Sequence, residues 1–170
     1  MSPTRTSLGT LLLALWLVVL PAAAAVPEQL QLVGSGKARW LTFTLYNAEL
    51  YSPTGNFASL EQSDYPLALS ITYQRTIAGQ RLVDATALEW QRLALAHRHE
   101  WVTELTALWP DVGPGDNITF VAHSRDNGEF FFNRQPLGTI QGERFATVFL
   151  AIWLSPETRD PRLRAALTGA

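Results

Sequence analysis

The apolar residues in the first half of the chain follow a strand pattern. Residues 30–52 are rich in β-branched and aromatic side chains, which predicts one strand or two, and Gly34 and Gly36 offer a bend. Within this stretch, residues 38–51 (ARWLTFTLYNAELY) are long enough for one continuous strand. A further strand is predicted at residues 67–73, where apolar side chains recur at every second position and indicate a half-buried surface.

The spacing of the apolar residues then lengthens. From Ile77 to Trp109 they recur at three- and four-residue steps with charged residues between them, which predicts two helices. Residues 109–116 (WPDVGPGD) hold two prolines and two glycines, so we expect the helical region to end there.

The C-terminal part predicts a hairpin followed by helices. Residues 117–124 have a strand pattern, and Asn127-Gly128 predicts a hairpin turn after them. Residues 130–140 are predicted to form the second strand of this hairpin. Residues 143–154 are apolar all round beyond their first turn, so we expect a helix buried between the sheet and another layer or lining a cavity. A short terminal helix follows. Without a regular βαβ alternation, this order predicts an α+β domain with a mainly antiparallel sheet.

The N-terminus has the features of a secretory signal peptide. Residues 1–25 place one arginine before an uncharged apolar stretch, and Ala23 and Ala25 stand where a signal peptidase cleaves. A membrane anchor needs about 20 apolar residues, and the strongly apolar stretch here is about half as long. We therefore expect a periplasmic or secreted protein that starts at Val26, forms one domain over residues 26–170 and has no stable membrane anchor.

Composition narrows the function classes. The chain has 170 residues, 47% of them hydrophobic, which is enough for one domain with a substantial core. Its net charge of -2 gives no overall basic field that would hold nucleic acid or an anionic membrane surface. The absence of cysteine excludes disulfides, thiol redox chemistry and thiolate metal sites.

The histidines do not predict a metal site. His97 and His99 are two positions apart, so on a helix they point to different faces, whereas zinc-binding pairs are four apart. No third ligand has a useful spacing, and we expect neither a metal nor a cofactor.

Arg39 and Tyr46 are the candidate ligand-binding residues, because both fall inside the long predicted strand. A buried arginine needs a carboxylate, a carbonyl cluster or a bound anion as its partner. Without a ligand, Arg39 would form a salt bridge to Glu49 or to a turn carboxylate, or lie exposed at a sheet edge. The two positions differ by an odd number, so a regular strand would point them to opposite faces. A shared site requires a bulge or a break between them.

Several segments, taken in order, resemble the chalcone isomerase-like family, in particular its bacterial exported branch. They are GSGKARWLTFTLYNAELY, YPLALSITYQRTI, LWPDVGPGDNITF, NGEFFFNRQPLGTI and FATVFLAIWLS. The resemblance implies an open-faced sandwich, in which helices pack on one face of a large antiparallel sheet and a ligand cleft lies between the two layers. It places Arg39 at the strand arginine of the family. Tyr46 falls where the family's fatty-acid-binding members have a tyrosine that, with the arginine, holds the ligand carboxylate.

The sequence departs from the isomerases of this family, which close a chalcone into a flavanone. The resemblance implies a catalytic tyrosine and asparagine within residues 78–86, and neither residue type occurs there. Ile152 and Trp153 replace a small hydroxyl residue and its neighbour and would narrow the cleft. These departures favour a non-catalytic protein that binds a small amphipathic carboxylate such as a fatty acid.

Two alternatives stay open. One is an isomerase or intramolecular lyase acting on a small aromatic or enone substrate, with Arg39 stabilising an oxyanion. The other is a structural or partner-binding domain whose cleft is filled by its own side chains. A continuous cavity with Arg39 at its wall would favour ligand binding or catalysis over a filled cleft.

Overall fold

The computed structural model of the protein describes residues 26–169, and the predicted signal peptide lies outside them. The described residues form six strands and four helices. In chain order they are β1 (Gln31–Trp40), β2 (Phe43–Ser52), β3 (Leu67–Tyr73), α1 (Gly79–Arg92), α2 (His99–Leu108), β4 (Asn117–Ala122), β5 (Asn127–Phe132), β6 (Gln135–Gln141), α3 (Phe145–Leu154) and α4 (Pro161–Thr168).

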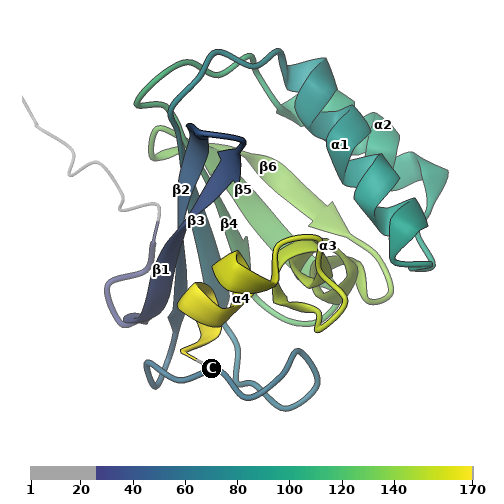
Figure 1. Ribbon diagram of the computed structural model, residues 1–170. Helices are drawn as coiled ribbons and strands as arrows, with labels where there is room; N and C mark the ends of the chain where they lie inside the picture. Colours follow the sequence, from purple (N-terminus) through teal and green to yellow (C-terminus); the bar gives the residue numbers. More distant parts are fainter. Residues whose placement is uncertain (1–25, 170) are drawn as a thin grey trace, which may run out of the picture.

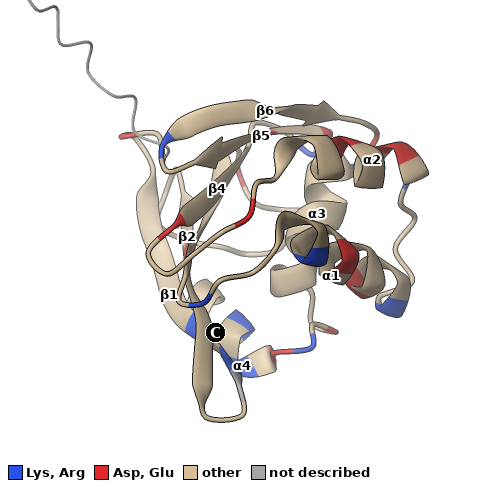
Figure 2. Ribbon diagram, turned by 90° about the horizontal axis from the view of Figure 1, so that it is seen from above, with Lys and Arg blue, Asp and Glu red and all other residues tan. Residues whose placement is uncertain are grey.

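The six strands form one sheet in sequence order, each antiparallel to the next. All four helices lie on the same side of this curved sheet (Figures 1 and 2). The α+β class and the open-faced sandwich are confirmed. No helix among the described residues is long and apolar enough to cross a bilayer.

The long N-terminal stretch folds as two strands, the second of the two predicted alternatives, and residues 38–51 do not form one continuous strand. β1 ends at Trp40 and pairs there with Phe43, which leaves a tight turn between them. Leu41 in this turn has a φ of 54°, a left-handed conformation that turns usually fill with glycine or asparagine. The sequence therefore carries no ordinary turn signal at this point.

Gly34 and Gly36 allow α4 to lie close to β1, and the pairing of β1 with β2 is irregular between Leu32 and Gly34. A Cβ at Gly34 would lie 2.3 Å from the Ala166 carbonyl oxygen, and one at Gly36 would lie 2.7 Å from Leu163 Cδ1. The two glycines thus serve the packing of a helix on the strand.

The predicted turn at Asn127-Gly128 is also wrong, because both residues lie in β5. Gly128 pairs with Ala122, and a Cβ there would lie 2.2 Å from the Phe120 ring, so the glycine makes room for an aromatic side chain. The β4–β5 turn occupies residues 123–126.

The segment 130–140, predicted as one strand, contains a second hairpin. Its turn is formed by Asn133 and Arg134, whose φ values of 47° and 71° are both left-handed. Left-handed conformations at both central residues match the twist of a two-residue β-hairpin.

Strand β3 lies in the middle of the sheet and is more buried than the predicted half-buried strand. Leu67 and Leu69 face the main core, as their alternation predicts. Ala68 on the opposite face is also fully buried, in a small cluster with Leu30 and Val121. A central strand with apolar neighbours on both faces loses the simple alternation of burial.

Helix α3 is buried on most sides, as predicted. Its Phe145 and Phe149 pack with Phe120 and Phe130 of the sheet, at ring-centroid distances between 4.6 and 6.4 Å. The Trp90 indole N–H donates to the Val148 carbonyl oxygen at 3.1 Å and joins α1 to α3. These contacts hold α1 and α3 on the sheet and define the space between them.

Candidate ligand-binding site

A cavity of about 250 Å³ lies between the sheet, α1 and α3. Its floor is formed by side chains of β2, β3 and β4, among them Leu69, Ile71 and Ile118. Its other walls are formed by one side of α1, by Trp109 and by the last turns of α3. The lining is mostly apolar and aromatic, which is the usual character of a small-molecule site, although the volume lies just below the ~300–1,000 Å³ typical of ligand pockets.

Tyr46 lines this cavity and is tied to α3. The Trp153 indole N–H donates to the Tyr46 hydroxyl oxygen at 3.0 Å, so the hydrogen of the phenol stays available for another acceptor. Burial raises the pKa of Tyr46 above the ordinary tyrosine value, and this outweighs the opposing effect of the Trp153 hydrogen bond. Tyr46 is therefore a protonated hydrogen-bond donor at neutral pH.

Tyr73 is a second uncommitted hydroxyl among the residues that line the cavity. Trp109 lines the cavity with its ring, whereas its indole nitrogen is buried away from the open space and has no hydrogen-bond partner among the described residues. The Tyr73 hydroxyl makes no hydrogen bond to a described residue, and burial raises the pKa of Tyr73 above its ordinary value. A buried donor without a partner costs free energy. This lining suits a ligand that brings a hydrogen-bond acceptor.

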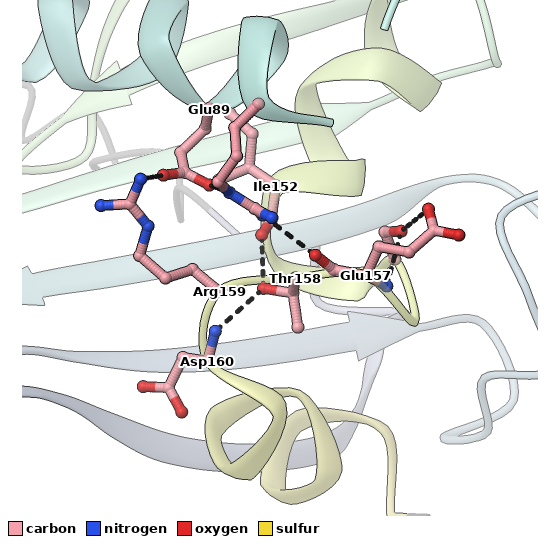
Figure 3. Close-up of polar contacts among 8 residues, drawn as sticks. Glu89, Ile152, Glu157, Thr158, Arg159 and Asp160 are labelled. Carbon is pink, nitrogen blue, oxygen red and sulfur yellow. Dashed lines mark hydrogen bonds and ion pairs between the residues drawn. The ribbon is translucent and has the colours of Figure 1, made fainter. Parts of the chain in front are cut away.

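Two charged residues line the cavity from α1. Arg81 is exposed and makes no ion pair with a described residue. Glu89 is paired twice: its carboxylate oxygens lie 2.8 Å from Arg92 Nε and 2.7 Å from an Arg159 guanidinium nitrogen (Figure 3). The guanidinium of Arg81 is therefore available to a ligand, whereas the carboxylate of Glu89 is not.

The ion pair between Glu89 and Arg159 fastens the loop between α3 and α4 onto α1 (Figure 3). Arg92 also donates to the Glu157 carbonyl oxygen at 3.0 Å, and the Thr158 hydroxyl donates to the Ile152 carbonyl oxygen at 2.7 Å. Because Glu89 and Ile152 both line the cavity, these contacts hold one of its walls in place.

We expect Glu89→Gln to loosen this wall. A neutral amide keeps the shape of the side chain but loses both charge-assisted contacts, and Arg159 is largely exposed, so the expected loss of stability is only about 1–2 kcal/mol. Urea unfolding measures the loss, and hydrogen exchange should rise in residues 155–160. Glu100→Gln, on the exposed surface of α2, is the matched control. Unchanged exchange in that loop would contradict the role of Glu89.

The structure does not bring Arg39 to the cavity. A bulge is present, because the register of β1 and β2 shifts between the pairs Ala38–Tyr46 and Arg39–Thr44. It allows the consecutive residues Leu45 and Tyr46 both to line the cavity. Arg39 itself is exposed and is not among the lining residues. A role for Arg39 in carboxylate binding stays a prediction.

Sequence reasoning missed Arg81, Tyr73 and Trp109 as lining residues. The resemblance pointed to residues 78–86 as the place of the polar groups that contact a ligand, and Arg81 lies in this segment. Trp153, interpreted as a residue that narrows the cleft, lines the cavity and is in addition the hydrogen-bond partner of Tyr46.

A larger hollow of about 720 Å³ lies on the other side of α3, next to the α1–α2 loop. Charges of both signs line it, and two loose ion pairs, Arg98–Glu143 and Arg144–Glu61, each span 3.8 Å. We take the smaller cavity as the candidate site because it holds the uncommitted hydrogen-bond donors.

A sheet with helices on one face and an apolar cavity between the two layers make this chain an open-faced α+β sandwich with a candidate small-molecule site. The family model described as chalcone isomerase-like matches residues 18–169, and the chain belongs to this family.

Two similar proteins extend the comparison. An uncharacterized protein of Haemophilus influenzae is 29% identical over 141 residues, which cover 82% of this chain and 68% of that protein. The crystal structure of a fatty-acid binding protein of Arabidopsis thaliana superposes with a TM-score of 0.65 at 11% identity, over 88% of this chain and 90% of that one. At this identity the likeness shows a common fold.

Proposed function

We propose that the protein binds a small amphipathic carboxylate such as a fatty acid, without catalysis. The observation that carries this proposal is an apolar cavity lined by two protonated tyrosine hydroxyls, with one guanidinium at its wall. The hydrocarbon part of the ligand would occupy the cavity. Its carboxylate would accept hydrogen bonds from Tyr46 and from a guanidinium, a charge-assisted arrangement.

Two arginines are candidates for the guanidinium. The sequence and the family resemblance favour Arg39, whereas Arg81 lines the cavity. We favour Arg81 because a charge-assisted hydrogen bond requires contact at about 2.7–2.9 Å. Arg39 is retained as the alternative.

The isomerase alternative has less support. Residues 78–86 contain no tyrosine or asparagine, and both cavity tyrosines have a raised pKa, which makes them poor bases at neutral pH. A filled cleft is disfavoured by the cavity itself. Export remains part of the proposal, with a chain that begins at Val26 after cleavage.

The test uses protein recovered from its own cell envelope. N-terminal sequencing should find Val26, and native mass spectrometry with lipid extraction should find a bound fatty acid. In titrations, a fatty acid should bind roughly ten- to a hundredfold more tightly than the alcohol of the same chain length, because the alcohol lacks the anionic head group. The rate at which a chalcone is converted should be the same with this preparation as in buffer alone. Equal affinity for acid and alcohol would contradict carboxylate recognition, and chalcone turnover would favour the isomerase.

A further inference from the structure

The turn between β1 and β2 exposes large apolar side chains to solvent. Leu41 is 83% exposed and Phe43 is 53% exposed, and they are two of the four large hydrophobic residues exposed in the described part of the chain. Leu41 also has a left-handed backbone, which is uncommon for a branched apolar residue and unfavourable. Neither the Leu41 nor the Phe43 side chain belongs to the main hydrophobic core or lines the cavity.

Cations lie on both faces of this hairpin, because Arg39 pairs with Thr44 and Phe43 pairs with Trp40, which puts Arg39 and Lys37 on the opposite face of the sheet from Phe43. Lys37 and Arg39 are exposed on β1 and make no ion pair with a described residue. The guanidinium of Arg75 lies 4.7 Å from the centre of the Phe43 ring. Residues 37–46 contain no acidic residue. We call Lys37, Arg39, Leu41, Phe43 and Arg75 the hairpin-tip surface.

The combination suits an anionic lipid bilayer. Exposed apolar side chains can enter the region between head groups and acyl chains, while cations beside them contact lipid phosphates. Cations near the surface of an anionic membrane each add to the attraction. The net charge of -2 gives the whole molecule no basic field, but charges farther than about 8–10 Å are largely screened, so the local cations dominate at the tip.

The residues of the hairpin-tip surface are followed within a few positions in the sequence by residues that line the cavity. β2 continues from Phe43 directly to Leu45 and Tyr46, which line the cavity. The Gln74 amide donates to the Leu45 carbonyl oxygen at 2.8 Å, which sets Arg75 beside the start of β2. α1 then begins at Gly79 and carries Arg81 to the cavity wall. A bilayer that contacted the tip would lie near this end of the cavity.

We propose that the hairpin-tip surface docks the protein reversibly on anionic phospholipid bilayers, with Leu41 and Phe43 inserted and Lys37, Arg39 and Arg75 on the head groups. Docking is an interaction separate from fatty-acid binding and needs no ligand in the cavity. A failure of either proposal therefore leaves the other standing.

The experiment is vesicle flotation of residues 26–170 without added fatty acid. Phosphatidylcholine vesicles are compared with vesicles that also contain phosphatidylglycerol, at low and high salt. We expect binding to require phosphatidylglycerol and to fall with salt. The double variant Leu41→Asn/Phe43→Thr should reduce partitioning at least about tenfold, because it removes the two apolar side chains that would enter the bilayer. Asparagine tolerates the left-handed conformation, so the fold should be kept. Arg75→Gln should reduce the partitioning less.

Leu88→Gln is the matched control, because Leu88 is 60% exposed on α1, outside the hairpin-tip surface. It should bind vesicles as the unchanged protein does. The proposal is overturned if anionic vesicles bind no protein, or if Leu88→Gln loses as much binding as the tip variant. It is likewise overturned if the tip variant abolishes self-association or binding to another protein while vesicle binding stays unchanged, since the surface would then serve a protein partner.

Discussion

Thr86→Phe is expected to abolish fatty-acid binding while leaving the protein folded. Thr86 is 6% exposed and lines the cavity from α1, and its hydroxyl donates only to the Leu82 carbonyl oxygen of the same helix. An aromatic ring at this position would occupy the space proposed for the hydrocarbon chain. We expect the affinity to fall at least about a hundredfold, or about 2.7 kcal/mol. Titration calorimetry or displacement of a fluorescent fatty acid measures this change.

The stability of the same variant separates a cavity from a filled core. Extra volume in a well-packed core costs about 1–3 kcal/mol. If the ring enters an empty space, the melting temperature should stay the same or rise. Thr86→Ser, which leaves the space open, should keep the affinity. Undiminished binding by Thr86→Phe would move the ligand to another site, with the larger hollow beside α3 as the next candidate.

Arg81→Ala is expected to weaken fatty-acid binding by about ten- to a hundredfold, because a hydrogen bond to a charged group contributes about 1.5–3 kcal/mol. Since Arg81 is exposed, the loss should shrink at high salt. Arg39→Ala is the matched variant: it removes the same charge from an exposed position that does not line the cavity. We expect it to cause a smaller loss of affinity and little change in melting temperature.

Tyr46→Phe completes the series. It removes the phenol donor and leaves the Trp153 indole N–H without its acceptor, so it should lower both the affinity and the melting temperature. A larger loss of affinity for Arg39→Ala than for Arg81→Ala would return the carboxylate-binding role to Arg39. If none of the three variants changed the affinity, the head group would lie elsewhere.

The sequence predicted the layers of this fold well because they depend on local periods. Alternation at residues 67–73 and three- to four-residue spacing from Ile77 to Trp109 predicted a strand and two helices, and the structure has them. The apolar segment 143–154 predicted a buried helix, which α3 is. Each signal comes from neighbours in the sequence, and burial of one continuous apolar face is enough to select the element.

Turns were predicted less well because the residues that adopt a left-handed backbone in them are not the glycines that usually do. Leu41 and Arg134 adopt left-handed conformations in turns. Gly34, by contrast, leaves space for helix α4, and Gly128 leaves space for the Phe120 ring. From the sequence, a glycine needed for space cannot be distinguished from one needed for a turn. The neighbour that requires the space lies far away along the chain.

The sequence by itself determined the class of fold, the family and Tyr46 as a candidate ligand-binding residue. Only the tertiary structure decided which side chains surround the cavity. Trp153 and Tyr46 are 107 positions apart and meet because the packing of α3 on β4 and β5 brings its last turn to the side of the cavity that β2 lines. Arg39 lies outside the cavity, while Arg81 lines it from α1. Periodicity determines which face of an element is buried, but strand register and helix packing, which depend on contacts between distant segments, determine which polar groups meet at a site.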